Sequence, residues 1–586
     1  MVKCLPKWRK KGMNSKKVLA LGMAAVMAAG MTGCSVPGEG GSTTAGSSTG
    51  TTAAAAADES AQGGETAAAD NNTTSATGLK VFRYATSTDP TSLDPVMGNS
   101  TADNEILHIT QEGLVRNSCG TISPGIAESW EISDDGLTYT FHLRDSTYSD
   151  GTPVTSKDFL YTFQHMADPA TAAPYAWIMD GRIKNGGDVI SGKKPVEELG
   201  VSAPDDKTFV IELEYPQGYF LSLLGSSGQF TPMNQALVEQ YGKDYAASAD
   251  KMLTNGPFKM VSSANRQYIF EKNENYWNAD AINFDRVELN VIENADTQLA
   301  MYEQGDLDYV AIPTTQVPNY DDRDQEFMTG SLDWLYINHQ ADYVSNENFC
   351  LALNYAIDRT TYNMLANSGT YQGWGNPVMP NVDGINSTYG EEFQPEGYPL
   401  DGDVAKAQEY LQKALTELGI SDPSEITVEL TTTDAETNKK IAEVIQEMWQ
   451  NNLGINVEIR QVTYSEIYGN VFPQHDYMVG YGGWGPDYAD PNTYLELFMS
   501  DNVYNYSQYS NADFDKLMND SRTIADPKTR LETLANAEQI LLDTGAVVPL
   551  QVRTTHYLID DDVTGVGFYF IGYTIDLVYG DCAPTE

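Results

Sequence analysis

One short stretch of the chain combines a carboxylate, aromatic rings and glycines in a pattern that suits a cationic ligand. This stretch is Tyr481 to Pro491, YGGWGPDYADP, in which Asp487 stands among aromatic residues directly after a glycine-rich strand end. Glycines leave strand backbone uncovered by side chains, so a ligand's main chain can approach it and form hydrogen bonds. An open strand edge beside a buried carboxylate suits a peptide with a free amino terminus.

The same stretch has two other interpretations. Gly480, Gly482 and Gly485 match the spacing G-x-G-x-x-G, which in a dinucleotide site opens a helix that receives the pyrophosphate. Pro486 and the Asp-Tyr-Ala-Asp-Pro run break any such helix, so the sequence argues against a dinucleotide. Asp487 also fits a turn carboxylate that caps backbone amides, which is the common role of aspartate beside glycine and proline. This second alternative stays open.

The elements around the stretch must hold the carboxylate in a loop between rigid parts. Residues 476–480 predict a short strand, and Asn492 predicts the cap of a helix that runs to Phe498. Upstream, helix and strand patterns alternate at 404–418, 426–430, 435–452, 455–461 and 464–471. Such a succession predicts an α/β fold with a largely parallel sheet and a ligand crevice at the carboxyl ends of its strands.

Length and charge narrow the class of protein. The chain has 586 residues, of which 41% are hydrophobic, and this predicts two or more lobes with large cores. Lysine and arginine total 35 against 82 acidic residues, a net charge of −47. Such a charge argues against nucleic acid and against anionic lipid headgroups as partners, since both are negatively charged.

The amino terminus predicts export and a lipid anchor. Residues 1–34 are predicted to be a lipoprotein signal peptide, because basic residues precede an apolar run that is too short for the roughly 20 residues of a transmembrane helix. The run ends in Met-Thr-Gly-Cys, which resembles a bacterial lipobox with methionine in place of the usual leucine. Cys34 is the expected lipidation site, and Met13 is an alternative start. Residues 35–78, rich in Ser, Thr, Ala and Gly, are expected to form a disordered tether.

Cysteine and histidine usage predicts neither a metal nor a cofactor. Cys119, Cys350 and Cys582 lie far apart in the sequence, which leaves room for one disulfide but not for a disulfide framework or a zinc site. The six histidines are scattered and contain no H-E-x-x-H motif.

Several long motifs resemble one protein family. Residues 138–143 alternate like a strand, and Thr155 with Asp158 forms a capping box for a helix to Met166. These residues lie within SPGIAESWEISDDGLTYTFHLRD and YSDGTPVTSKDFLYTF, which resemble the extracytoplasmic solute-binding proteins of peptide ABC transporters, family 5, and especially their oligopeptide-binding branch. The resemblance continues through TNGPFKM, ENADTQLAMYEQGDLDYV, LNYAIDR and GWGPDYADPNTYLELF.

The resemblance implies a fold and its division. The family fold is a two-lobed α/β periplasmic-binding-protein fold of type II, cluster C, with a hinge and an extra subdomain. By similarity the first lobe comprises 79–122, 254–338 and 551–586, the extra subdomain 123–253, and the second lobe 339–550.

The resemblance also implies a set of peptide-binding residues. Asp487 would pair with the peptide α-ammonium, and the backbone of the 483–485 stretch would hydrogen-bond the peptide main chain. Trp484 and Tyr488 would line the amine end or pack in the core, and both possibilities stay open. The whole expected set is Asn99, Ser100, Thr101, Tyr481, Gly483, Trp484, Gly485, Asp487 and Tyr488.

One departure from the family concerns the peptide's other end. Enteric oligopeptide binders place basic residues there, where this chain has Asn354, Asn438 and Tyr481. None of the three is positively charged, so recognition of the C-terminal carboxylate is expected to be weaker or located elsewhere.

The expected function is therefore binding of oligopeptides outside the cytoplasm and their delivery to an ABC transporter permease by a lipid-anchored monomer. Two alternatives remain: the same fold with another solute, such as an oligosaccharide or a metal chelate, or a secreted hydrolase. The sequence argues against a hydrolase, because residues 225–228 (GSSG) do not match G-x-S-x-G and no nucleophile with its base is visible. A pair of catalytic carboxylates far apart in the sequence stays conceivable.

Overall fold

The computed structural model describes residues 78–98, 100–320, 322–524 and 526–585. The predicted signal peptide, Cys34, all but the last residue of the predicted tether, and Asn99 lie outside the described residues.

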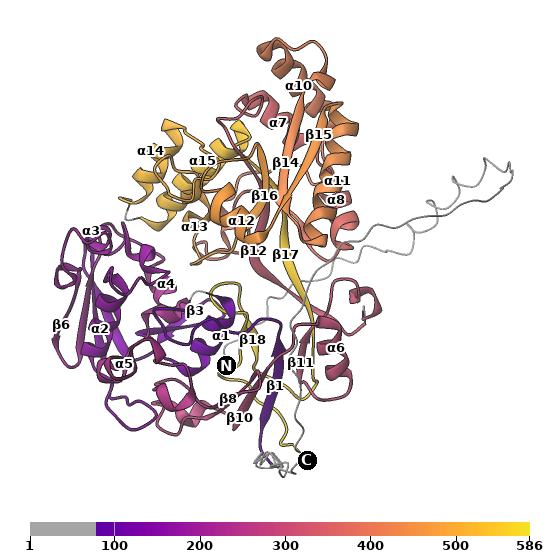
Figure 1. The fold of residues 1–586 in the computed structure, drawn as a ribbon. Helices are drawn as coiled ribbons and strands as arrows, with labels where there is room; N and C mark the ends of the chain where they lie inside the picture. The colour runs from indigo at the N-terminus through magenta and orange to yellow at the C-terminus, as the bar shows by residue number, and fades with distance from the viewer. Residues whose placement is uncertain (1–77, 99, 321, 525, 586) are drawn as a thin grey trace, which may run out of the picture. The chain divides into compact units, whose positions relative to one another are not determined.

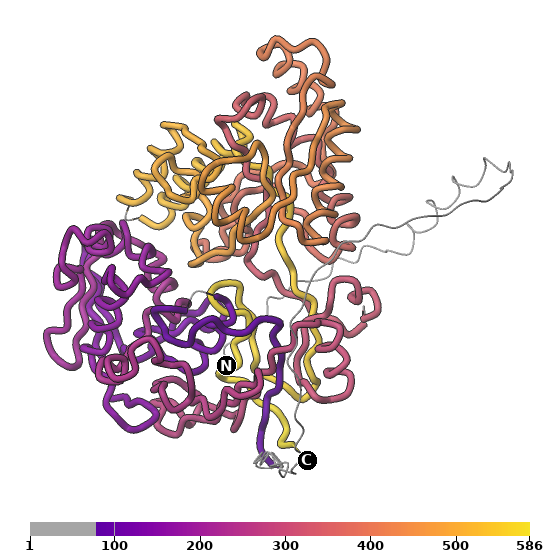
Figure 2. Tube along the Cα trace, in the orientation of Figure 1, coloured from indigo at the N-terminus to yellow at the C-terminus, as the bar shows by residue number. Residues whose placement is uncertain are grey.

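A mixed four-stranded sheet carries the first part of the folded chain. Its order is β1 (Val81–Thr86), β10 (Arg286–Val291), β9 (Gln267–Lys272) and β8 (Phe258–Ala264), and only β1 and β10 are parallel. The C-terminal chain returns to this sheet, where the Thr585 amide donates to the Leu79 carbonyl at 2.8 Å. Figure 2 shows this yellow segment running beside the indigo start of the described chain. The two ends of the described chain therefore close the same part of the fold.

A second sheet is antiparallel throughout. It is built from β4 (Ala127–Ile132), β5 (Thr138–Leu143), β7 (Thr208–Glu212) and β6 (Val201–Asp205), in this order. Helix α2 (Ser156–Ala167) packs on it and begins with the predicted capping box of Thr155 and Asp158. The predictions of the strand at 138–143 and of this helix start are confirmed.

The third and largest sheet has seven strands. Its order is β11 (Tyr309–Ala311), β17 (Val547–Ile559), β12 (Gln325–Ile337), β16 (Val479–Trp484), β14 (Thr427–Thr433) and β15 (Asn456–Val462), with β13 (Gln372–Gly373) also paired to β17. Figure 1 shows α10 (Val404–Leu418), α11 (Glu436–Leu453), α7 (Glu347–Tyr355) and α8 (Arg359–Asn367) around β14 and β15. Buried side chains on both faces, including Trp334 and Trp449, form its cores.

The remaining elements connect these sheets. They are α1 (Thr101–Thr110), β2 (Val115–Ser118), β3 (Thr121–Pro124), α3 (Gly186–Ile190), α4 (Phe220–Ser226), α5 (Gln235–Tyr241), α6 (Ala295–Glu303), α9 (Tyr389–Glu392), α12 (Tyr464–Glu466), α13 (Asn492–Leu495), α14 (Ala512–Ser521), α15 (Pro527–Thr544), β18 (Gly567–Phe568) and β19 (Ile575–Asp576).

The prediction of a largely parallel sheet is wrong for the large sheet as a whole. Only β14 pairs in parallel, with β15 and with β16, whereas β12 runs antiparallel to both β16 and β17. Parallel pairs need helical crossovers. The alternation of helices and strands that predicts such crossovers is confined to the part of the chain that forms β14, β15 and β16.

The strand before the key loop begins later than predicted. The prediction was 476–480, but β16 covers Val479–Trp484 and includes the glycines. Gly482 lies against the ring of Tyr336, and Gly483 lies against the Leu332 carbonyl, so a side chain at either position would collide with β12. Close packing between strands therefore requires the glycines here, although glycine has a low strand propensity.

A bulge interrupts the pairing of the two longest strands, β12 and β17. Their register shifts between Met328 and Leu332, and Gly330 in this interval has φ +79°. A side chain at Gly330 would meet the Phe570 carbonyl. Thr329 and Ser331, within this interval, line a cavity that is described below, and bulges are common next to functional sites.

Among the described residues, Cys119, Cys350 and Cys582 form no disulfide with one another.

Candidate functional site

A cavity of about 520 Å³ collects segments from distant parts of the sequence. It is lined by the start of α1 with Ser100 and Thr101, by Tyr175, by the loop after β16 with Gly485 and Asp487, and by residues of the 569–574 turn. The structure thus brings together four of the predicted site residues, namely Ser100, Thr101, Gly485 and Asp487. The volume lies within the range of sites that hold small organic ligands.

The Asp487 carboxylate is poised to change its charge at the cavity wall. Burial raises its pKa to about 7, the nearby Arg182 guanidinium opposes this shift, and Glu496 adds to it. The Tyr175 hydroxyl donates a hydrogen bond to the same carboxylate and stabilises its charged form. A cation that enters the cavity would relieve the cost of keeping this carboxylate charged.

The loop that carries Asp487 is held by its own helix start. The Asp487 amide donates to Thr493 Oγ1 at 3.2 Å, and the Asn492 amide donates to Asp490 Oδ1 at 3.0 Å. Asp490, not the predicted Asn492, therefore supplies the capping carboxylate, and α13 covers only Asn492–Leu495 before a 3-10 turn at Glu496–Phe498. In the hydrogen bonds of the described residues, the Asp487 carboxylate caps no backbone amide, which separates it from the turn-capping role.

Strand β16 offers an open edge beside this carboxylate. It pairs with β12 along its whole length, from Val479 to Trp484, but with β14 only at Val479 and Gly480. The stretch from Tyr481 to Trp484 therefore has no strand partner on its second side within the described sheet. An extended chain is the kind of ligand that can hydrogen-bond to such an edge.

Trp484 and Tyr488 pack against protein and do not line the cavity. The Trp484 ring lies 5.5 Å from the Tyr504 ring, centroid to centroid. Tyr488 has no exposed surface, and its ring stacks on Tyr219 at 4.0 Å between centroids. Its hydroxyl donates to Glu496 at 2.8 Å. Both residues therefore pack against aromatic neighbours in this structure.

An interface that the sequence did not reveal lies behind Asp487. Arg182, next to the antiparallel sheet, forms a buried ion pair with Glu496 at 2.7 Å, and its guanidinium lies over the Tyr488 ring. Asp490 forms a second buried pair with Arg530 at 2.6 Å. These residues are far apart in the sequence, so no local pattern signals their contact. They position the loop that carries Asp487.

Tyr481 belongs to a buried polar cluster within the large sheet. Its hydroxyl donates to Asp333 Oδ2 at 3.0 Å, and Gln551 Nε2 donates to the same oxygen at 2.8 Å. Arg553 on β17 completes the cluster with a two-point contact to Asp333, from Nε at 3.0 Å and from Nη2 at 2.9 Å. A guanidinium therefore lies beside Tyr481, although position 481 itself carries no charge.

The two asparagines at the other expected positions are already engaged. Asn354 is fully buried, and its amide donates to the carbonyls of Cys350 and Val547, both at 3.1 Å. Asn438 donates to Thr433 Oγ1 at 2.7 Å. Asn354 is therefore a core residue that no ligand can reach in this structure.

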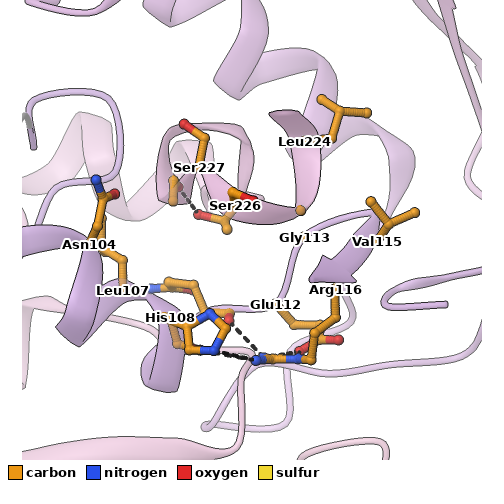
Figure 3. Close-up of a pocket in the computed structure, with 14 residues that line it drawn as sticks. Asn104, Leu107, His108, Glu112, Gly113, Val115, Arg116, Leu224, Ser226 and Ser227 are labelled. Atoms are coloured by element: carbon orange, nitrogen blue, oxygen red, sulfur yellow. Dashed lines mark hydrogen bonds and ion pairs between the residues drawn. The ribbon is translucent and has the colours of Figure 1, made fainter. Parts of the chain in front are cut away.

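A second, much smaller cavity of about 20 Å³ lies next to the main one (Figure 3). Figure 3 shows His108, Arg116 and Glu112 together on one side of it. The Arg116 Nε donates to Glu112 at 2.8 Å, and His108 Nε2 faces Asp576 at 3.2 Å. A cavity of this size holds about one water molecule. Its charged side chains are already paired with one another.

No metal site or membrane span is found in the described part of the chain. Within the described ranges, His, Cys, Asp and Glu side chains form no group of three or more that could hold a metal ion. Among the same residues, no helix combines the length and the apolar character needed to cross a bilayer.

The fold and the site together define an α/β solute-binding protein of the two-lobed type. The family described as bacterial extracellular solute-binding proteins, family 5, matches residues 121–506, and the chain belongs to this family. This confirms the resemblance that the motifs predicted.

Individual relatives cover most of the chain. The oligopeptide-binding protein OppA of Bacillus subtilis (strain 168) is 33% identical over 492 residues, which are 82% of this chain and 88% of that protein. The periplasmic oligopeptide-binding protein OppA of Salmonella typhimurium is 32% identical over 488 residues, covering 81% and 87%. The solved structure of Listeria monocytogenes OppA bound to peptide matches with a TM-score of 0.70 and 31% identity, over 86% of this chain and 99% of that one.

Proposed function

We propose that this chain binds oligopeptides outside the cytoplasm and delivers them to an ABC transporter permease. The observation that carries the proposal is the placement of Asp487 at the wall of the large cavity, next to the open edge of β16. The carboxylate would receive the peptide α-ammonium, while the edge would bind the main chain irrespective of sequence. The named relatives, which bind oligopeptides, support this ligand class.

The proposed peptide site comprises Ser100, Thr101, Gly483, Gly485 and Asp487, with Tyr175 added from the structure. Ser100 and Thr101, at the start of α1, line the same cavity as Asp487. Asn99 remains a member of the proposed set on sequence grounds alone. Trp484, Tyr481 and Tyr488 act through packing and hydrogen bonds that shape β16 and its loop, not through contact with the peptide.

The protein is proposed to act as a binder and not as an enzyme. A hydrolase needs a nucleophile within hydrogen-bonding reach of its base. Among the described residues, the Thr171 hydroxyl lies 3.1 Å from Nδ1 of His165, but neither residue lines the main cavity. His108 Nε2 faces Asp576 and Arg116 and no hydroxyl nucleophile. The same fold with an oligosaccharide or a metal chelate remains the second candidate. A carboxylate with a pKa raised to about 7 favours a cationic ligand group over a neutral sugar.

Closure of two lobes on a hinge is part of the proposal. The first lobe is taken as 79–122, 254–338 and 551–586, the extra subdomain as 123–253, and the second lobe as 339–550. Support comes from the bulge around Gly330, which interrupts the β12–β17 ladder near the boundary at 338. A ligand that bridges both walls of the cavity would favour the closed form.

The mature protein is proposed to be a monomer anchored to the bacterial cell membrane by a lipid on Cys34. Its support is the predicted signal sequence and lipobox together with membership of an extracellular family.

Mass spectrometry of molecules released on denaturing the purified protein tests the ligand class, and peptides of varied sequence are the expected result. Calorimetric titration with tri-alanine and its N-acetylated form then tests the proposed site. Binding of the free amine with loss on acetylation supports it, whereas equal affinity for both peptides contradicts it. Recovery of a sugar or a metal chelate alone would favour the second candidate.

A further inference from the structure

We propose that Arg553 is the group that receives a carboxylate of the bound peptide. This inference rests on the proposed function. It assigns to Arg553 the positive charge for the peptide carboxylate that Asn354, Asn438 and Tyr481 do not supply. The carboxylate is the C-terminus of a short peptide or an acidic side chain of a longer one.

The exposure of the ion pair is strongly one-sided. The Asp333 side chain is 2% exposed and that of Arg553 is 47% exposed. Asp333 takes Nε and Nη2 of the guanidinium, and Nη1 has no hydrogen-bond partner among the described residues. A half-exposed guanidinium held by a buried carboxylate is rigid, and its free side can still donate to a second anion.

The ion pair lies against the glycine stretch of β16. Gly483 is the direct strand partner of Asp333, and a Cβ atom added at Gly483 would lie 3.0 Å from Asp333 Oδ1. Ser331, two residues before Asp333 on β12, lines the main cavity. Because Gly483 has no side chain, no Cβ atom at this position covers the Asp333 carboxylate.

Polar aromatic groups surround the same guanidinium. The Tyr481 hydroxyl shares the Asp333 carboxylate with Arg553. Burial raises the pKa of the Tyr371 and Tyr468 hydroxyls, and the positive charge of Arg553 partly opposes this shift in both. Phenol hydroxyls can donate to an anion, so they complement the guanidinium in an anion-binding environment.

The charge balance of the cluster favours an anionic ligand group over a cationic one. Asp333 is already satisfied by Tyr481, Gln551 and Arg553, so it has little capacity left for a ligand cation. The negatively charged Asp487 lies in the loop after β16, four residues beyond Gly483. The two ends of the proposed site would thus match the two termini of a peptide.

The separation of the two charges sets the ligand length. Gly483 and Asp487 are four residues apart, and four extended residues span at most about 14 Å. A peptide with its ammonium at Asp487 would bring the carboxylate of its third or fourth residue to the level of Gly483. Tri- and tetra-alanine are therefore the probes for the C-terminal source of the carboxylate.

The test is calorimetric titration of wild type and Arg553→Gln with tri- and tetra-alanine and their C-terminal amides. Amidation should weaken wild-type binding by about ten- to a hundredfold, which is the lower part of the range for lost charge pairs because Arg553 is half exposed. The Arg553→Gln protein should bind the free acid as weakly as the wild type binds the amide, and amidation should cost it little more. Arg323→Gln is the matched control, since Arg323 is 52% exposed and forms one ion pair with Glu303.

A second arm separates the two sources of the carboxylate. Penta-alanine amide is compared with the same peptide carrying Glu at its third or fourth position. Stronger binding of the Glu peptide to wild type but not to Arg553→Gln assigns an acidic side chain, and loss on amidation of the short peptides assigns the C-terminus.

A purely structural role of the ion pair gives a different result. The Arg553→Gln protein would then melt at a lower temperature and bind acid and amide with equal loss. If the single variant does not fold, Asp333→Asn with Arg553→Gln removes both charges and keeps the comparison. Wild-type affinity that is unchanged by amidation and by Glu, but lost on N-acetylation, overturns the role of Arg553 and leaves the proposed function standing. No binding of any peptide overturns both.

Discussion

The hydroxyl of Tyr175 and the carboxylate of Asp487 form a hydrogen bond at the wall of the main cavity. Tyr175 lies near the antiparallel sheet of β4, β5, β7 and β6, whereas Asp487 follows β16 of the seven-stranded sheet. The contact therefore joins two separately built parts of the fold at the point where we place the ligand's ammonium.

Changing Asp487 to Asn should weaken binding of tri-alanine by about 2–5 kcal/mol, because the variant keeps the shape of the side chain but loses the charge. N-acetylation of the peptide should harm the wild type in a similar way and the variant little further, which a calorimetric double-mutant cycle measures. Asp383→Asn is the matched control, since burial also raises the pKa of Asp383, to about 6, and Asp383 does not line the cavity. A control that loses as much affinity would contradict the assignment.

The same variant should stabilise the ligand-free protein. The folded-state pKa of Asp487 is raised, so the folded state binds its proton more tightly than the unfolded chain, and this residue's contribution to stability is lost as pH rises towards 7. Urea unfolding at pH 8 should therefore show a gain of about 1–3 kcal/mol for Asp487→Asn. A turn-capping carboxylate predicts the opposite sign.

Affinity should depend on pH with a maximum between about 7 and 8. Binding an ammonium requires the charged carboxylate, so protonation of Asp487 below its pKa of about 7 lowers the affinity by up to about tenfold per pH unit. Above about pH 8 the peptide's own amino group loses its proton. Calorimetry from pH 5 to 9 should show the acidic limb in the wild type, and the Asp487→Asn protein should lack it.

Tyr175→Phe should move this acidic limb to higher pH. Loss of the hydroxyl removes a hydrogen bond that stabilises the charged carboxylate, so the pKa of Asp487 rises further. Affinity should fall several-fold at pH 7 and recover towards the wild-type value at pH 8. Tyr504→Phe serves as the control, because its ring lies close enough for the Asp487 charge to affect its pKa, without a hydrogen bond to that carboxylate. Equal profiles for the two variants would remove Tyr175 from the site.

Breaking the Arg182–Glu496 pair should destabilise the protein strongly. Both side chains are largely buried, so Arg182→Met leaves Glu496 without its charge partner and should cost about 3–5 kcal/mol in urea unfolding. Adding Glu496→Gln should restore part of this loss. Strict additivity of the two changes would show that the pair is not coupled in solution.

Much of the fold follows from local sequence signals. Helix α10 has the predicted bounds, because Asp403 caps its start and Gly419 adopts the left-handed conformation that ends it. The start of α2 can also be predicted from the sequence, because Thr155 and Asp158 form a capping box. Strand β16 is not, because its glycines are required by contacts with Tyr336 and Leu332 on a strand more than a hundred residues earlier.

The candidate site divides in the same way. Asp487 stands out in the sequence because glycines and aromatic residues surround it. Tyr175, Arg182 and Arg553 carry no local signal, since their partners are brought to them only by the packing of separate sheets. Their types are ordinary in the sequence, and only the three-dimensional contacts distinguish them.

The one-sided pairing of β16 also bears on how the protein avoids self-association. An unpaired strand edge is a template on which other copies of a protein can add strands and aggregate. Here the open stretch from Tyr481 to Trp484 is short and lies in the interior of the seven-stranded sheet, between β12 and β14. A folded neighbour cannot present a strand at such a position, whereas a single extended chain can enter it. The position of this edge inside the sheet therefore disfavours strand pairing between folded copies of the protein, while the edge stays accessible to an extended ligand.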